Sequence, residues 1–222
     1  MTLEERVASV RQVLKKESVP WGRPPLLVAV TKYSAPEEIL PLAQLQVTDI
    51  GENRVQAIRE KLPCLDGKFS IHLIGRLQTN KVKYIIRDVC LIHSLDRMDL
   101  AQEIDRQAQK AERKMPVLIQ VNIAKEPQKG GIAEEELLPC LRQWARLPGL
   151  QLKGLMTMMP LGAERDIIFR YFQRMRALLD QCRQEAVEGT DMTELSMGMS
   201  QDYDLAARAG ATMVRVGSAL FR

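Results

Sequence analysis

Lys32 is the residue whose type and position point most directly to covalent chemistry. It follows Leu26 to Val30, a continuous apolar run that is typical of a buried strand. Burial of a lysine stem disfavours the charged ammonium, lowers its pKa and gives a neutral amine nucleophile. Such an amine can form a Schiff base with an aldehyde. A strand-end lysine that points into water is the alternative, and the residues alone leave both open.

Small residues near the end of the chain form a second candidate site. Ser200 lies in the segment MGMSQDYD at an expected helix start, and Gly217 and Ser218 follow an apolar run in RVGSALF. Backbone N–H groups in such turns cradle a phosphate where small side chains allow a close approach. Capping and turn geometry alone would select the same residue types, so a purely structural role is the alternative.

Buried polar residues elsewhere could serve either the core or a ligand. Arg215 lies inside the last apolar run, so its guanidinium must pair with an acid such as Glu52 or Asp204, or face a ligand atom. His72 and His93 lie in apolar runs and are most simply core histidines. Methionine is a flexible core filler, and that is the first interpretation of the cluster Met156, Met158, Met159, Met197 and Met199.

The elements that must position these residues alternate along the chain. A helix is expected over residues 2–17, where Leu3, Val7, Val10 and Leu14 recur at helical spacing. Strands are expected at 26–30, 49–53, 70–75, 89–95, 116–123, 150–159, 194–199 and 212–220. Helices are expected between them at 36–45, 54–61, 79–86, 97–113, 134–146, 164–186 and 202–209.

This alternation predicts an α/β fold. Parallel neighbours need crossover connections, and continuous apolar runs indicate strands that are covered on both faces. Eight βα units in 222 residues favour a single (β/α)8 barrel over 1–222, with an extra N-terminal helix. An open doubly wound sheet is the rival, but no GxGxxG follows the first strand. In a barrel, the carboxyl ends of the strands would hold the site.

Composition excludes several classes of function. The net charge is +4, the charges of both signs are interleaved and aromatic residues make up 5%, so we expect no nucleic-acid partner. The four cysteines form no CxxC and the two histidines lie at no metal-ligand spacing, so we expect no metal site. We see no signal peptide and no apolar stretch long enough to span a membrane, and therefore expect a cytoplasmic protein with free thiols.

The loop at 125–131 carries two lysines and two glycines. A solvated loop is the simplest interpretation. A mobile lid and a second phosphate contact are the alternatives.

Several stretches match a known family in order and cover nearly the whole chain. They are LLVAVTK (26–32), DIGENRVQ (49–56), HLIGRLQTNK (72–81), IHSLDR (92–97), VLIQVNI (117–123), KGGI (129–132), LKGLMTM (152–158) and LSMGMSQDYDLAARAGATMVRVGSALF (195–221). On these residues the chain resembles the YggS/PROSC family of pyridoxal 5′-phosphate (PLP)-binding proteins, the PLP homeostasis proteins.

The resemblance implies a barrel like the N-terminal domain of alanine racemase, the type III fold of PLP proteins. It implies a Schiff base between PLP and Lys32, with an arginine, Arg215, against the pyridine nitrogen. The other cofactor-binding residues that it implies are phosphate contacts and pocket-lining positions, namely Ser200, Gly217, Ser218, Asn53, His72 and Met199.

The resemblance also implies a PLP binder in vitamin B6 and amino-acid or keto-acid homeostasis, without clear turnover, with apo-PLP enzymes as candidate recipients. We expect a monomer, because no swapped or second-domain element is visible in the sequence. A cation against the pyridine nitrogen disfavours its protonation, and an unprotonated ring is a weaker electron sink. Racemases of this fold add a C-terminal β domain and a partner tyrosine, neither of which we expect here. A small PLP-dependent amino-acid racemase is the alternative, and a sugar isomerase that binds phosphate on the same barrel is a third.

Overall fold

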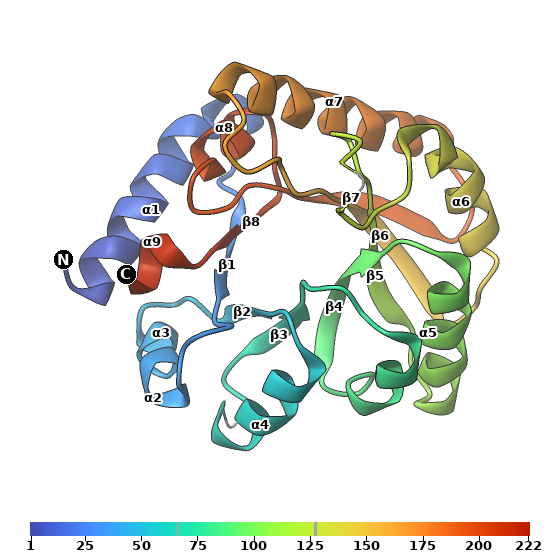
Figure 1. The fold of residues 1–222 in the computed structure, drawn as a ribbon, viewed down its shortest axis with the longest axis horizontal. Helices are drawn as coiled ribbons and strands as arrows, with labels where there is room; N and C mark the ends of the chain where they lie inside the picture. The colour runs from blue at the N-terminus through green and yellow to red at the C-terminus, as the bar shows by residue number, and fades with distance from the viewer. Residues whose placement is uncertain (66, 127) are drawn as a thin grey trace.

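Eight parallel strands close into a barrel in the order β1 to β8, with β8 paired back onto β1 (Figure 1). The structure is a computed structural model that describes residues 1–65, 67–126 and 128–222. The strands are β1 (Leu26–Val30), β2 (Asp49–Glu52), β3 (Ser70–Leu73), β4 (Val89–Leu95), β5 (Met115–Gln120), β6 (Leu150–Met156), β7 (Thr190–Ser196) and β8 (Met213–Val216). The (β/α)8 barrel predicted from the sequence is therefore confirmed.

Helices surround the barrel and follow the strands in turn (Figure 1). The α-helices are α1 (Leu3–Glu17), α2 (Pro36–Ile39), α3 (Pro41–Gln44), α4 (Val55–Leu65), α5 (Met98–Lys110), α6 (Leu137–Trp144), α7 (Arg165–Gln184), α8 (Tyr203–Arg208) and α9 (Ser218–Phe221). Short 3₁₀ helices complete the ring: η1 (Val19–Trp21), η2 (Thr79–Tyr84) and η3 (Glu134–Glu136).

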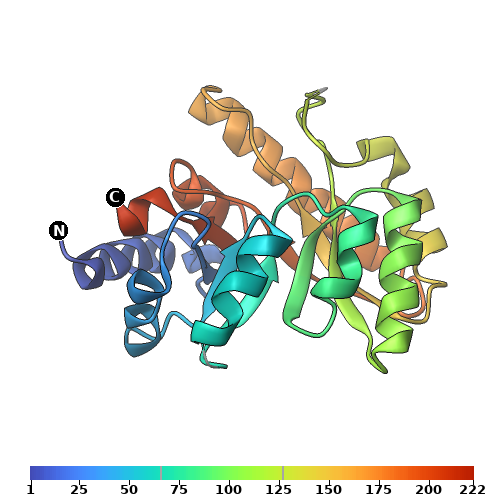
Figure 2. The same cartoon turned by 60° about the horizontal axis from the view of Figure 1, so that its bottom comes forward.

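The extra N-terminal helix α1 is built as its sequence predicts. Thr2 and Glu5 form a capping box, in which each side chain accepts a hydrogen bond from the backbone N–H of the other residue. The buried face of α1 carries Val7, Val10 and Leu14. The helix lies beside α8 and α9, so the two termini are close together (Figures 1 and 2). It thus covers the closing strands β8 and β1.

Two predicted elements differ from the structure in ways that matter for the site. The last strand was expected over 212–220, but it ends at Val216 and α9 begins at Ser218. The reason is that the N–H groups of Gly217 and Ala219 bond to the hydroxyl of Ser200 instead of a neighbouring strand. The seventh strand was expected at 194–199, but it runs from Thr190 to Ser196, which leaves 197–202 as a loop at the mouth of the barrel.

The segments expected as helices at 36–45 and 79–86 also differ in detail. The first divides into α2 and α3 at Pro41, which has no N–H to continue the helical hydrogen bonds. The second is the 3₁₀ helix η2.

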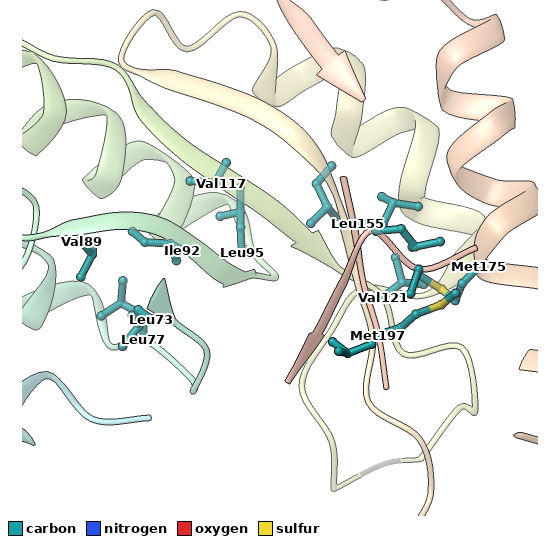
Figure 3. Close-up of a cluster of buried hydrophobic side chains, with 14 of the residues drawn as sticks. Leu73, Leu77, Val89, Ile92, Leu95, Val117, Val121, Leu155, Met175 and Met197 are labelled. Carbon is teal, nitrogen blue, oxygen red and sulfur yellow. The ribbon is translucent and has the colours of Figure 1, made fainter. Parts of the chain in front are cut away.

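The main apolar core lies between the strands and the surrounding helices. Figure 3 shows part of this core, in which strand residues such as Ile92, Val117 and Leu155 join Met175 from α7. A second, smaller cluster joins Leu91, Leu118, Met156 and Met213. The two clusters use different residues of the same strands, as expected when both faces are buried.

Gly154 tests how closely β6 fits against β7. A Cβ at this position would lie 1.8 Å from the carbonyl oxygen of Glu194. We expect Gly154→Ala to lower the free energy of unfolding by about 3 kcal/mol or more, measured by urea denaturation. Gly162→Ala is the matched control, because Gly162 also has a positive φ (+76°) but nothing within 4 Å of its Cβ position. Its cost should stay near 1–2 kcal/mol, and equal costs at both positions would contradict the packing argument.

Candidate functional site

A cavity of about 500 Å³ opens at the carboxyl ends of β1, β7 and β8. Its walls come from the turn after β1 and from the segments that follow β6, β7 and β8. Six of the residues singled out in the sequence line it: Lys32, Met199, Ser200, Arg215, Gly217 and Ser218. The barrel therefore brings together residues that lie up to 186 positions apart in the chain, from 32 to 218. The other two predicted site residues, Asn53 and His72, do not line this cavity.

Lys32 lies in the turn after β1, and its side chain is exposed. The amine lies 4.9 Å from the centroid of the Tyr33 ring, a cation–π contact at the edge of the cavity. Of the two alternatives for Lys32, the structure shows the strand-end lysine that points into water. β1 ends at Val30, so Lys32 is already beyond the part of the chain that the helices cover.

The backbone before Lys32 is fixed by a buried ion pair that the sequence analysis did not find. The hydroxyl of Thr31 donates to Glu52 at 2.6 Å. Lys61 donates both to the same carboxylate oxygen at 2.6 Å and to the carbonyl of Thr31 at 2.7 Å. Glu52 is 1% exposed, so this ion pair is well shielded from solvent. Lys32 thus extends from an anchored strand end.

The loop after β7 and the start of α9 meet at Ser200. The Ser200 hydroxyl accepts hydrogen bonds from the N–H groups of Gly217 and Ala219, at 3.1 and 3.2 Å. A Cβ at Gly217 would lie 3.2 Å from Cβ of Val30, so glycine lets α9 begin close to β1. Hydroxyl groups and small residues therefore form this side of the cavity, as a phosphate-binding site requires.

Asp202 stabilises the loop after β7. Its carboxylate accepts a hydrogen bond from the N–H of Met199 at 2.6 Å. Burial raises the pKa of this carboxyl, and the bond from Met199 partly opposes that rise. Met199 itself is 36% exposed and lines the cavity. Met156, Met159 and Met197 are buried as expected, and Met159 also lines the cavity.

Arg215 projects from β8 into the interior of the barrel and is 3% exposed. Its guanidinium donates to the hydroxyl of Ser196 at 2.6 Å and to the carbonyl of Thr157 at 2.8 Å. Of the two alternatives for Arg215, pairing with Glu52 or Asp204 is not found, because Glu52 binds Lys61 and Asp204 binds Arg165. Burial lowers the pKa of Arg215 to about 10, so it remains a cation at neutral pH.

A chain of hydrogen bonds runs from Arg215 through the barrel interior. Ser196 contacts Nδ1 of His93 at 2.9 Å, and Nε2 of His93 contacts Nδ1 of His72, also at 2.9 Å. Nε2 of His72 contacts Asp49 at 3.0 Å. One assignment satisfies every group: Arg215 donates to Ser196, and each residue donates to the next until Asp49 accepts. His72 therefore belongs to this interior chain.

Asn53 lies in a separate groove that follows β2 and β3. This groove shares no lining residue with the first cavity. The assignment of Asn53 and His72 to the cofactor pocket stays a prediction from the family resemblance.

The described part of the 125–131 loop is tied to the barrel. Lys129 pairs with Glu126 and donates to the carbonyl of Met159 at 2.6 Å. Asn122 also donates to the carbonyl of Glu126. Residue 127 lies outside the described residues. Met159 lines the first cavity, so this loop adjoins it.

The described residues give little indication of metal binding, cysteine chemistry or membrane spanning. His, Cys, Asp and Glu side chains of ranges 1–65, 67–126 and 128–222 form no group suited to a metal ion. All four cysteines are free, and burial raises the pKa of Cys90 to about 12 and of Cys182 to about 11. Within the same ranges, no helix combines the length and apolar character that crossing a membrane requires.

The fold places this chain in a known class of proteins. Residues 5–222 match the family described as alanine racemase, N-terminal domain. Alanine racemase of Clostridium difficile shares the fold, with a TM-score of 0.77 over 99% of this chain and 59% of that one, at 16% identity.

Relatives of similar sequence identify the family within this class. A pyridoxal phosphate homeostasis protein of Aquifex aeolicus is 39% identical over 98% of this chain and 96% of its own length. The protein of that name from Synechocystis is 36% identical over 88% of this chain and 89% of its own. PipY of Synechococcus elongatus, solved with PLP bound, has a TM-score of 0.88 at 32% identity, and each chain is covered fully. The chain belongs to the family of pyridoxal phosphate homeostasis proteins.

The buried His93 predicts a specific dependence of stability on pH. Burial, His72 and Arg215 together hold the pKa of His93 well below its usual value. Below about pH 6.5 the unfolded chain binds a proton there and the folded chain does not, so stability falls as the pH falls. The free energy of unfolding should therefore be lower at about pH 5 than at about pH 7.5 because of this group.

Urea denaturation at both pH values, on the wild type and on His93→Gln, isolates this contribution. The carboxylates are the same in both proteins, so the variant should lose less stability on acidification. An identical pH dependence would contradict a neutral, buried His93.

Proposed function

We propose that this protein binds PLP in the first cavity, covalently through Lys32, and acts in vitamin B6 and amino-acid or keto-acid homeostasis as a binder without clear turnover. The observation that carries the proposal is the convergence of an accessible amine, a buried arginine and a cradle of small hydroxyl residues in one cavity. PipY, a relative of full coverage, was solved with PLP bound, which supports the same ligand here.

The residues of the cavity fit this ligand in size and chemistry. A volume of about 500 Å³ suits a small cofactor, since ligand pockets span about 300–1,000 Å³. Ser200, Gly217 and Ser218 would hold the phosphate, because they line the wall where α9 begins, and a phosphate oxygen could replace the Ser200 hydroxyl as acceptor of the Gly217 and Ala219 N–H groups. Lys32, which lines the same cavity, would hold the ligand covalently. When bound, PLP supplies an aldehyde that condenses with amines and a ring that can accept electrons.

Arg215 favours binding over catalysis. Its partners Ser196 and Thr157 are neutral, so its positive charge is not cancelled by an ion pair. A cation in this position opposes protonation of a ring nitrogen placed against it. Arg215 would thus make the ring of bound PLP a weaker electron sink, which would give little support to abstraction of an amino-acid α-proton.

A racemase remains the alternative because Lys32 could serve one face of an amino acid. Racemisation with two bases requires a second proton-transfer group on the other face. Asp202 lines the cavity, but its carboxylate is engaged by the N–H of Met199. Tyr33 is 77% exposed beside Lys32, which gives it no fixed position across from the amine.

We further propose that the protein acts as a monomer in the cytoplasm and supplies the cofactor to apo-PLP enzymes. The exposed position of Lys32 supports a transfer role, because the amine can be reached by solvent and by competing amines.

Lys32→Ala should abolish covalent loading. We expect the visible absorption of the PLP-loaded protein to fall at least about tenfold at equal protein concentration, since the amine nucleophile is lost. The exposed Lys114 lies before β5, at the other end of the barrel, so Lys114→Ala is the control and should keep the band. A band that persists in Lys32→Ala would place the covalent bond on another lysine.

A panel of L-amino acids separates a binder from a racemase. Incubation of the PLP-loaded protein with each amino acid in D₂O should give little α-proton exchange and no accumulation of D-isomers beyond that of free PLP. Chiral chromatography and NMR measure the two quantities. Multiple turnovers per protein that Lys32→Ala abolishes would favour the racemase.

A further inference from the structure

The groove that contains Asn53 has the composition of an anion site. It measures about 320 Å³ and lies between the start of α4 and the segment from β3 to η2. Every charged residue that lines it is a cation, namely Arg54, Arg59, Arg76 and Lys81. The remaining lining residues are mainly amides and Tyr84.

Among the residues that the structure describes, no acid neutralises these four cations. Within the described residues, Arg54, Arg59, Arg76 and Lys81 form neither an ion pair nor a hydrogen bond through their side chains. Many arginines elsewhere do pair with carboxylates: Arg97, Arg106, Arg142, Arg165, Arg174, Arg176 and Arg183. Four positive charges without an acidic partner in the described part of the chain therefore line one groove.

Tyr84 brings several of the positive charges close to one another. Its ring centroid lies 5.1 Å from the guanidinium of Arg59, 5.8 Å from the amine of Lys81 and 4.9 Å from that of Lys83. The ring face attracts each cation, but the cations repel one another. A bound anion would remove this repulsion.

The backbone of the groove also favours an anion. Helix α4 begins at Val55 in the wall of the groove and has no acidic residue in its first turn, so its positive end is not compensated by its own side chains. The opposite wall can lie close because residue 75 is glycine: a Cβ there would lie 2.3 Å from the carbonyl oxygen of Asn53.

We propose that this groove binds a small molecule that carries a phosphate or pyrophosphate group, at the same end of the barrel as the first cavity but independently of it. Arginine pairs with phosphate oxygens through two parallel N–H groups, and a helix N-terminus favours the same charge. The concave shape and the volume of about 320 Å³ suit a molecule of metabolite size. This site goes beyond the binding of PLP at Lys32, because the two cavities share no lining residue.

Calorimetric titration of inorganic pyrophosphate into the PLP-loaded protein tests the proposal. The wild type should bind about one equivalent, and Arg59→Gln/Arg76→Gln should weaken binding at least about tenfold, because two charge-assisted contacts are lost. Both arginines are exposed, so the variant should fold normally. The matched control is Arg23→Gln/Lys114→Gln, which removes the same charge from exposed positions before β1 and β5, and it should bind within about twofold of the wild type.

Three outcomes would overturn the proposal. The first is no binding of pyrophosphate to the wild type, and the second is an equal loss in both double variants, which would indicate a general charge effect. The third is tighter binding of hexaglutamate than of pyrophosphate, which would make the groove a docking surface for acidic peptides. The visible band of the same samples reports on the first cavity, so a failure of PLP binding is seen separately and leaves the comparison between the variants valid.

Discussion

A guanidinium buried inside a closed barrel is the constraint on which the polar interior of this protein depends. A buried charge without compensation costs several kcal/mol, and Arg215 forms no ion pair with the described residues. Its charge is instead distributed over the hydroxyl of Ser196 and the carbonyl of Thr157. Because Ser196 accepts from Arg215, its own proton is free to go to His93. The orientation of the whole interior chain follows from this one charge.

The same chain of hydrogen bonds explains why two histidines occupy the barrel core. His93 passes a hydrogen bond to His72, which ends on Asp49 at the first residue of β2. The cationic end of this hydrogen-bond chain, Arg215, therefore lies at the first cavity. The anionic end, Asp49, lies where β2 begins. A neutral His93 is consistent with this direction, since a protonated ring would place a second charge beside Arg215.

The fold could be predicted from the sequence because alternation of apolar runs and amphipathic segments is a local signal, and a barrel follows from the number of repeats. The gathering of Lys32, Ser200 and Gly217 was also predictable, since each follows a strand. The contact between His72 and His93 was not, because it depends on the register of neighbouring strands. The exposure of Lys32 and the role of Lys61 at Thr31 depend on where β1 ends, and strand ends are poorly marked in sequence.

For the approach of a ligand, the positions of the charges on this protein matter more than its net charge. A net charge of +4 in 222 residues is modest, yet Lys32 and the four cations of the second groove all follow the carboxyl ends of strands and so share one end of the barrel. Fields from unpaired charges on one face add, and they guide anions toward that face before any contact forms. Asp49, the carboxylate of the interior hydrogen-bond chain, lies at the other end of the barrel. Approach of a phosphorylated ligand is thus favoured from the end at which both cavities open.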